Sequence, residues 1–136
     1  MRSLAFPYIR LGSHFVPIIP ITLFSRNLAF NTEAYVDSGA SYSIFRSEIL
    51  DTLRLRREEG QLKMLKAADG NFIPVHLFRL AVQIGDVKIR ALVGFSDKLN
   101  VGFNVLGRHA IFSCFEEVVF NEKARKIIFR QKMRHR

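Results

Sequence analysis

Short apolar segments separated by turn-forming residues dominate the chain. Most of these segments are rich in Val, Ile, Thr and Phe and end at Gly, Pro, Asn, Asp or Ser, which is typical of β strands. The pattern predicts strands at residues 15–24, 28–36, 62–68, 72–80, 80–84, 87–95, 118–121 and 126–130. We therefore expect an all-β domain with one or two short helices.

Turn signals join several of these strands into hairpins. Residues 25–27 (Ser-Arg-Asn) and 85–86 (Gly-Asp) each separate two strand patterns by a few polar residues. Residues 68–71 read Ala-Asp-Gly-Asn, and Asp-Gly is a strong short-range hairpin signal. The sequence thus predicts three hairpins.

Prolines restrict two of the strands. Pro17 and Pro20 interrupt residues 15–24, so we expect an edge or irregular strand there. Pro74 lies in the returning strand of the 62–80 hairpin, which favours an exposed or edge arm.

Helical spacing is clearest in residues 43–53. Apolar residues recur there at positions 45, 49, 50 and 53, with Ser43 or Ser47 as a cap. Residues 54–60 and 96–102 are predicted to be loops, and a short amphipathic piece follows residue 108 and ends at Cys114.

Length and composition narrow the class of protein. The 136 residues, 49% hydrophobic and 24% charged, indicate a single globular domain over residues 1–136, with its core at about 15–130.

The lone cysteine, Cys114, cannot form an internal disulfide, and its apolar surroundings predict a buried, inert thiol. The longest apolar run is too short to span a bilayer, and no signal peptide is recognisable. We expect a soluble, intracellular (cytoplasmic) protein without a membrane segment.

The net charge of +9 is concentrated at the C-terminus. Residues 123–136 hold seven Lys or Arg and no acid, which leaves fourteen basic and twelve acidic residues, a net of +2, in residues 1–122. Such a segment could contact nucleic acid or an anionic partner. A solvated chain end, or an edge strand kept soluble by its charge, explains it equally simply and is favoured.

The candidate chemistry begins at residues 34–41, Ala-Tyr-Val-Asp-Ser-Gly-Ala-Ser. An apolar strand delivers the Asp37 carboxylate to a tight turn, where Ser38 offers a hydroxyl and Gly39 lets backbone approach the carboxylate closely. Two neighbouring carboxylates that share one proton can hydrolyse a peptide bond through an activated water. The motif occurs once, so such a site needs two chains. Asp-Ser-Gly also marks plain turns, and the motif alone leaves both interpretations open.

Two later features favour a site. A Gly-tipped hairpin around Gly70 follows the motif by some thirty residues, and residues 104–108 then read Asn-Val-Leu-Gly-Arg before a short helical piece. In this order, strand, Asp loop, hairpin and apolar-apolar-Gly-Arg segment, the chain resembles the single-domain retroviral-type aspartic proteases (retropepsins) over roughly residues 15–130.

The resemblance implies a fold and a set of roles. The fold would be a closed or partly open β-barrel, and a homodimer would complete the active site. Asp37 would be the catalytic aspartate, with Ser38, Gly39 and Ala40 supporting its loop. Ser38 would bond across the dimer, and Gly39 would bond the carboxylate or border the substrate.

The resemblance also implies roles for two later segments. Val105, Leu106 and Gly107 would form the strand that flanks the Asp loop, and Arg108 would open the following helix. A flap over residues 66–75 would cover an extended polypeptide substrate, with its tip at Ala68, Asp69, Gly70, Asn71 and Phe72.

One departure from the retroviral pattern concerns specificity. Retroviral enzymes often carry acidic residues just after the Asp loop, where this chain has Ser41, Tyr42 and Ser43. Arg108 therefore lacks its usual acidic partner, and the chain is closer to the cellular and bacterial retropepsin-like proteins.

Other chemistry finds little support in the sequence. No His, Cys or Asp pair has metal-ligand spacing, and the four histidines are scattered. Residues 102–107 lack the Lys-Ser/Thr of a phosphate loop. We expect an aspartic endopeptidase without metal or cofactor. The alternative is an inactive, dimeric binding or regulatory module of the same fold. Its basic C-terminal segment would then contact a nucleic acid or an acidic partner.

Overall fold

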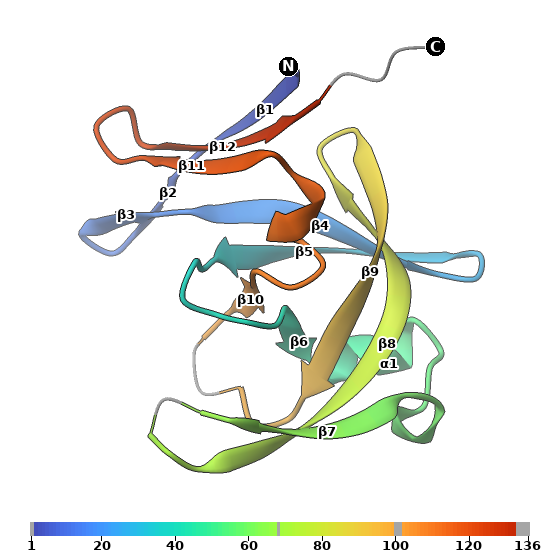
Figure 1. Ribbon diagram of the computed structural model, residues 1–136. Helices are drawn as coiled ribbons and strands as arrows, with labels where there is room; N and C mark the ends of the chain where they lie inside the picture. Colours follow the sequence, from blue (N-terminus) through green and yellow to red (C-terminus); the bar gives the residue numbers. More distant parts are fainter. Residues whose placement is uncertain (1, 68, 100–101, 133–136) are drawn as a thin grey trace.

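Strands make up most of the protein. The computed structural model describes residues 2–67, 69–99 and 102–132 (Figure 1). The strands are β1 (Arg2–Pro7), β2 (Ile9–Leu11), β3 (His14–Val16), β4 (Ile18–Ser25), β5 (Leu28–Val36), β6 (Ile44–Arg46), β7 (Gln61–Lys66), β8 (Phe72–Ile84), β9 (Val87–Ser96), β10 (Asn104–Leu106), β11 (Glu117–Asn121) and β12 (Lys126–Gln131). The short helices are α1 (Glu48–Thr52) and the 3₁₀ helices η1 (Arg57–Glu59) and η2 (Phe112–Cys114). The predicted all-β class is confirmed.

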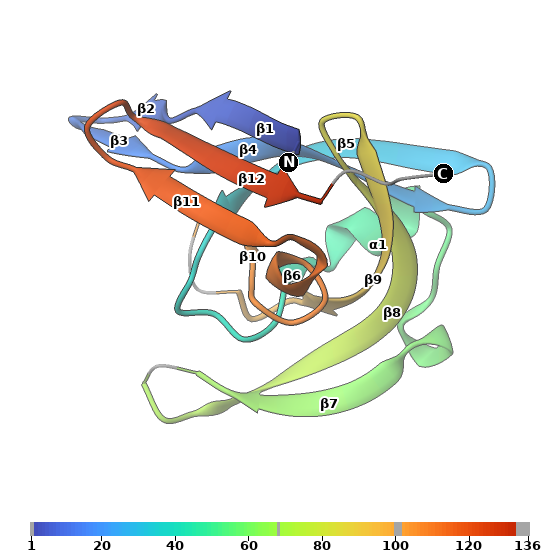
Figure 2. The ribbon, with the colours of Figure 1, turned by 45° about the horizontal axis from the view of Figure 1, so that its top comes forward.

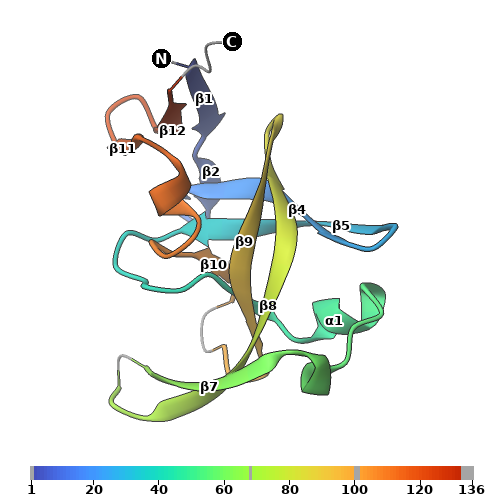
Figure 3. The same cartoon turned by 45° about the vertical axis from the view of Figure 1, so that its right-hand side comes forward.

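The main sheet closes on itself as a barrel. Its strand order is β4-β5-β10-β6-β9-β8-β7, and β4 also pairs with β8, Thr22 opposite Gln83 and Phe24 opposite Ala81. β7 lies outside this closed ring. It pairs with β8 as a hairpin that extends from the end of the molecule opposite β1, β11 and β12, as Figures 1 and 3 show.

Alternating apolar positions build the core inside the barrel. Ile19, Ile21 and Leu23 of β4 are almost fully buried, because every second residue of a strand points to the same face. Phe95 packs near both Phe45 and Phe78, with ring centroids 6.1 and 5.7 Å away. These aromatic contacts join β6, β8 and β9, the strands that lead to and from the candidate site.

A second sheet, ordered β1-β12-β11, lies against one end of the barrel (Figure 2). Its inner row pairs Phe6 with Ile127 and Ile127 with Phe120. Ile127 and Phe129 of β12 are fully buried, while Phe6 and Phe120 pack against the core from the flanking strands. The sheet therefore belongs to the same hydrophobic core as the barrel.

Most predicted strands and hairpins are confirmed. The 25–27 turn joins β4 to β5 with Ser25 opposite Leu28, and the 85–86 turn joins β8 to β9 with Ile84 opposite Val87. Pro74 lies where β8 pairs only with β7, as expected for an edge arm.

Several expectations were wrong. Residues 44–46 form β6 rather than helix, so only the second half of the 43–53 pattern is helical and Ser47 is its N-cap. The strand predicted at residues 15–24 is interrupted at Pro17, between β3 and β4, and Pro20 lies where β4 pairs only with β5, as expected; residues 22–24, however, pair on both sides and are not an edge. No strand was predicted at residues 2–7, where β1 lies, and Tyr8 is buried, so the packed core begins before residue 15.

The C-terminal segment is also not what its charge suggested. β12 is the middle strand of its sheet, not an edge strand or a solvated end. Its charged residues lie on the face opposite Ile127 and Phe129, and Arg130 forms an ion pair with Glu117. Residues 133–136 of this segment lie outside the described residues.

Candidate active site

Two distant segments meet at the end of β5 to hold the Asp37 loop. β10 runs parallel to β5, with Leu106 beside Val36, and the Asp37 amide donates to the Leu106 carbonyl at 3.0 Å. The Gly39 amide donates to Asp37 Oδ1 at 2.8 Å. The loop backbone thus fixes the position of the carboxylate, and charge-assisted hydrogen bonds of this kind are comparatively strong.

Two glycines lie at close approaches at this junction, and at Gly107 the space admits no side chain. A Cβ on Gly39 would lie 3.3 Å from Asp37 Oδ1. A Cβ on Gly107 would lie 2.4 Å from the Tyr42 carbonyl oxygen and 2.8 Å from that of Ala40, well inside van der Waals contact. Any side chain at 107 would therefore displace the Asp37 loop.

Further backbone hydrogen bonds join the Asp loop to the segment after β10. The Arg108 amide donates to the Ala40 carbonyl at 2.9 Å, and the His109 amide donates to the Ser41 carbonyl at 2.8 Å. Ser43 is fully buried and its Oγ accepts the Gly107 amide at 2.9 Å. The structure therefore brings together residues 37–43 and 105–109, both of which the sequence had singled out.

The loop opens toward the surface. Asp37 and Ala40 are half-buried, whereas Ser38 and Gly39 are exposed. Within the described part of the chain the Ser38 hydroxyl makes no hydrogen bond, so it is available to another molecule. Arg108 is also exposed, and no described acid forms an ion pair with it.

The predicted flap corresponds to the β7–β8 hairpin. At its tip Asp69 accepts hydrogen bonds from the amide and the side chain of Asn71, at 3.0 and 3.1 Å, and Gly70 has φ +90°. Asp69, Gly70, Asn71 and Phe72 are exposed, Phe72 by 62%, while Ala68 lies outside the described residues. Among the described residues no hydrogen bond or ion pair joins this tip to the Asp37 loop. The tip and the loop lie on the same side of the molecule in Figures 1 and 3.

One contact between the hairpin and the loop was missed by sequence reasoning. Lys63 of β7 donates to the Tyr42 hydroxyl at 2.7 Å, and the Tyr42 ring stacks on His109 with centroids 5.2 Å apart. The only signal was that Tyr42 occupies a position where retroviral enzymes often have an acid. The contact ties the base of the hairpin to the segment that follows Asp37.

A stacked aromatic pair borders the same junction. The ring centroids of Tyr35 and Phe103 lie 5.0 Å apart. Tyr35 directly precedes Val36, which pairs with Leu106, and Phe103 directly precedes Asn104, which pairs with Ala34. The pair adds a side-chain contact between the end of β5 and the segment that enters β10.

Cys114 differs from its prediction. It lies at the end of η2 and is exposed, not buried, and its thiol donates to the Ala110 carbonyl at 2.9 Å. Partial burial of the sulfur raises the pKa of the Cys114 thiol. The side chain therefore favours the neutral thiol over the nucleophilic thiolate.

The described residues contain neither a metal-binding cluster nor a membrane-spanning helix. Residues 2–67, 69–99 and 102–132 contain no group of three His, Cys, Asp or Glu side chains arranged to hold a metal ion. In the same residues no helix has both the length and the apolar character needed to cross a membrane.

The closed sheet with its projecting hairpin, and the Asp loop held by β10, define a retropepsin-like fold. The solved structure described as a retropepsin-like aspartic protease from Rickettsia conorii is similar to this chain, with a TM-score of 0.62 and 18% sequence identity. The match covers 94% of this chain and 90% of that chain. The sequence matches no protein-family profile and no curated protein. At this identity the likeness establishes the fold.

Proposed function

We propose that the protein is a homodimeric aspartic endopeptidase in which each subunit supplies Asp37. The observation that carries this proposal is the Asp37 carboxylate itself. It lies half-buried at the surface, with one oxygen held by the Gly39 amide and its own amide held by Leu106. The loop is therefore preorganised, as a catalytic carboxylate requires.

Two such carboxylates, one from each subunit, supply the chemistry. At close range they cannot both ionise, so the pair shares one proton. The ionised carboxylate takes a proton from water, whose oxygen attacks the peptide carbonyl carbon while the protonated carboxyl donates a hydrogen bond to the carbonyl oxygen. The carboxyl that took the water proton then gives it to the leaving nitrogen as the C–N bond breaks, and the pair again shares one proton.

The free edge of β11 is the surface we assign to the subunit contact. β11 pairs with β12 on one side only and consists of Glu117, Val118, Val119, Phe120 and Asn121, with a single charge and no proline. Such an edge is a template for another strand. An antiparallel pairing of β11 with its copy is symmetric, as a two-fold dimer requires.

The substrate is an extended polypeptide that binds between the Asp37 loop and the β7–β8 hairpin. Among the described strands β7 pairs only with β8, so its outer edge has backbone groups that a peptide can meet. The Lys63–Tyr42 contact keeps the base of the hairpin close to the Asp37 loop.

Replacement of Asp37 tests the proposal. D37N should lower cleavage of an unfolded polypeptide by at least about 100-fold, because it removes the general base, and should leave dimerisation unchanged. Cleavage is followed by gel electrophoresis and mass spectrometry, and dimerisation by analytical ultracentrifugation. D51N, at an exposed acid of α1, is the matched control and should cleave as the wild type does. Wild-type cleavage that persists in D37N would contradict the mechanism, and a dimer without any cleavage would favour the inactive binding module.

A further inference from the structure

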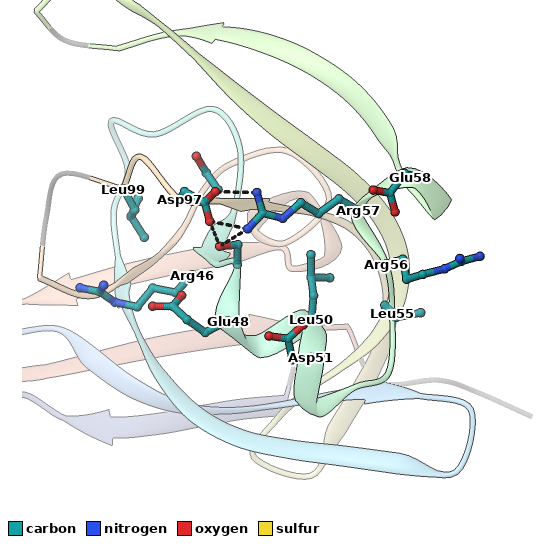
Figure 4. Close-up of a pocket in the computed structure, with 12 residues that line it drawn as sticks. Arg46, Glu48, Leu50, Asp51, Leu55, Arg56, Arg57, Glu58, Asp97 and Leu99 are labelled. Atoms are coloured by element: carbon teal, nitrogen blue, oxygen red, sulfur yellow. Dashed lines mark hydrogen bonds and ion pairs between the residues drawn. The ribbon is translucent and has the colours of Figure 1, made fainter.

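A polar cluster links three elements next to the base of the β7–β8 hairpin (Figure 4). Arg57 of η1 makes two hydrogen bonds to Asp97, Nη1 to Oδ2 at 2.6 Å and Nη2 to Oδ1 at 2.8 Å. The Ser47 hydroxyl also donates to Asp97 Oδ1. The three side chains border a cleft of about 560 Å³. Paired Arg–carboxylate bonds fix orientation as well as distance.

The Ser47 hydroxyl bonds to this cluster instead of capping helix α1. It is the N-cap of α1, yet its side chain makes no capping hydrogen bond. Its hydroxyl contacts Asp97 instead, and this hydrogen bond, together with Arg57, lowers the pKa of the Asp97 carboxyl. The carboxylate therefore stays ionised in mild acid.

Ser96, the residue before Asp97, holds the other strand of the hairpin. It is only 2% exposed, and its hydroxyl donates to the Pro74 carbonyl of β8 at 3.0 Å and accepts the Lys98 amide at 3.0 Å. The Ser47 amide donates to the Ser96 carbonyl at 3.3 Å. Ser96 and Asp97 therefore contact the hairpin from both sides, through Pro74 of β8 and through Arg57 just before β7.

The junction between η1 and β7 is tight as well. A Cβ on Gly60, the residue before β7, would lie 2.5 Å from the Phe78 ring and 2.8 Å from the Leu77 carbonyl oxygen. A displacement of Arg57 should therefore displace β7 as well, because closely packed elements move together.

The same corner connects to the Asp37 loop. The Arg46 amide, one residue before Ser47, donates to Asn104 Oδ1 at 2.9 Å. Asn104 is the first residue of β10, whose Leu106 carbonyl accepts the Asp37 amide. Two hydrogen bonds, joined by the backbone of residues 46–47 and 104–106, thus connect the cluster to the Asp37 loop.

We propose that Ser47, Arg57, Ser96 and Asp97 form a hinge cluster that positions the β7–β8 hairpin over the Asp37 loop. These are positioning residues, since none of them touches the carboxylate. The proposal rests on the proposed function only in that the hairpin covers substrate. The cluster would fix the distance between the β7–β8 hairpin and the Asp37 loop. That distance determines the affinity for an extended peptide bound between them.

A double-mutant cycle measured by hydrogen exchange tests the cluster in the absence of substrate. R57Q and D97N should each speed backbone exchange in residues 61–66 and 72–75 by about fivefold, the scale of an exposed ion pair. The double variant should exchange no faster than either single variant, because both lose one interaction. R54Q, which changes a nearby exposed Arg whose side chain makes no hydrogen bond or ion pair with any described residue, is the matched control and should leave exchange unchanged. Unaltered exchange in R57Q and D97N, or additive effects in the double variant, would overturn the proposal.

Kinetics separate the positioning role from catalysis. R57Q should raise KM about fivefold and leave kcat within twofold, and R57K, which keeps the charge but loses the paired geometry, should lie between R57Q and the wild type. A lower kcat at unchanged KM would contradict positioning. If the wild type cleaves nothing, the proposed function fails, and the exchange cycle still decides on the hinge cluster.

Discussion

Gly107 shows how a single backbone position supports the Asp37 carboxylate. Carbonyl oxygens of Tyr42 and Ala40 lie where its Cβ would be, and its amide donates to the buried Ser43 hydroxyl. A glycine here serves close packing, not an unusual φ. Ser43 and Gly107 thus form one unit, although the chain separates them by more than sixty residues.

Replacing Gly107 with Ala should therefore destabilise the protein and disturb the loop. Overpacking of this kind costs about 1–3 kcal/mol, and two backbone carbonyls cannot move aside as a flexible side chain would. The free energy of unfolding is measured by chemical denaturation. G102A is the matched control, because a Cβ there meets nothing within 4 Å, and it should change stability by less than about 0.5 kcal/mol. Equal free energies of unfolding for G107A and G102A would contradict the prediction, because they would show that the Asp37 loop moves to accept a Cβ at little cost.

The element scale separates what the sequence predicts from what it does not. Hairpins such as 25–28 and 84–87 are local: the turn residues and both strands lie together in the sequence, so their pattern is sufficient. β6 was misread because Phe45 fits a helical repeat with Ile49, and its real partner, Phe95 of β9, lies fifty residues away. β1 was not predicted for the same reason, since it pairs with β12, at the other end of the described chain.

The candidate site follows the same division. Its two main segments, residues 37–40 and 105–108, could be singled out because each is a short continuous motif. The contacts that hold the hairpin, Lys63 to Tyr42 and Arg57 to Asp97, were not, because single polar residues on a loop or strand give no pattern before the fold brings them together.

β12 shows an element whose charge conceals its role. Phe129 is fully buried and contacts Phe6 and Phe115, with ring centroids 6.1 and 4.9 Å away. F129A should cost about 3–5 kcal/mol of unfolding free energy, as truncation of a buried Phe does. I128A, one residue earlier and half-buried on the opposite face, is the control and should cost clearly less. Similar losses in denaturant titrations would contradict the assigned facing of the strand.

This placement also governs how the basic segment can be studied. Deletion of residues 123–136 would remove the middle strand of the sheet and expose β1 and β11. Any effect of the basic charge on binding is therefore measured with Lys-to-Gln and Arg-to-Gln substitutions, which keep the strand in place.

At the scale of the whole molecule, the two sheets present different edges to a second copy. β1 ends in Pro7, which has no amide to donate, and its Arg2 forms an ion pair with Asp86 in the β8–β9 turn. β11 contains no proline, and its one charged residue, Glu117, pairs with Arg130 of the same sheet. If two copies of β11 pair with Val119 opposite Val119, Glu117 faces the partner's Asn121 and Val118 faces the partner's Phe120. No like charges meet in this register, so β11 is the edge better suited to self-association.

A charge placed at the centre of that contact should separate the subunits. In V119K the two lysines would lie directly opposite each other and repel, and the dimer dissociation constant should rise at least about fivefold, roughly 1 kcal/mol. Cleavage should fall in proportion at low protein concentration and recover at high concentration or high salt, because screening weakens the repulsion. A5K is the matched control: Ala5, Ile128 and Val119 form one row across the sheet, so the same charge is added at the opposite edge. Sedimentation velocity over a range of concentrations measures both variants. Loss of the dimer in A5K but not in V119K would move the contact to β1, and an unchanged dimer in both would place it outside this sheet.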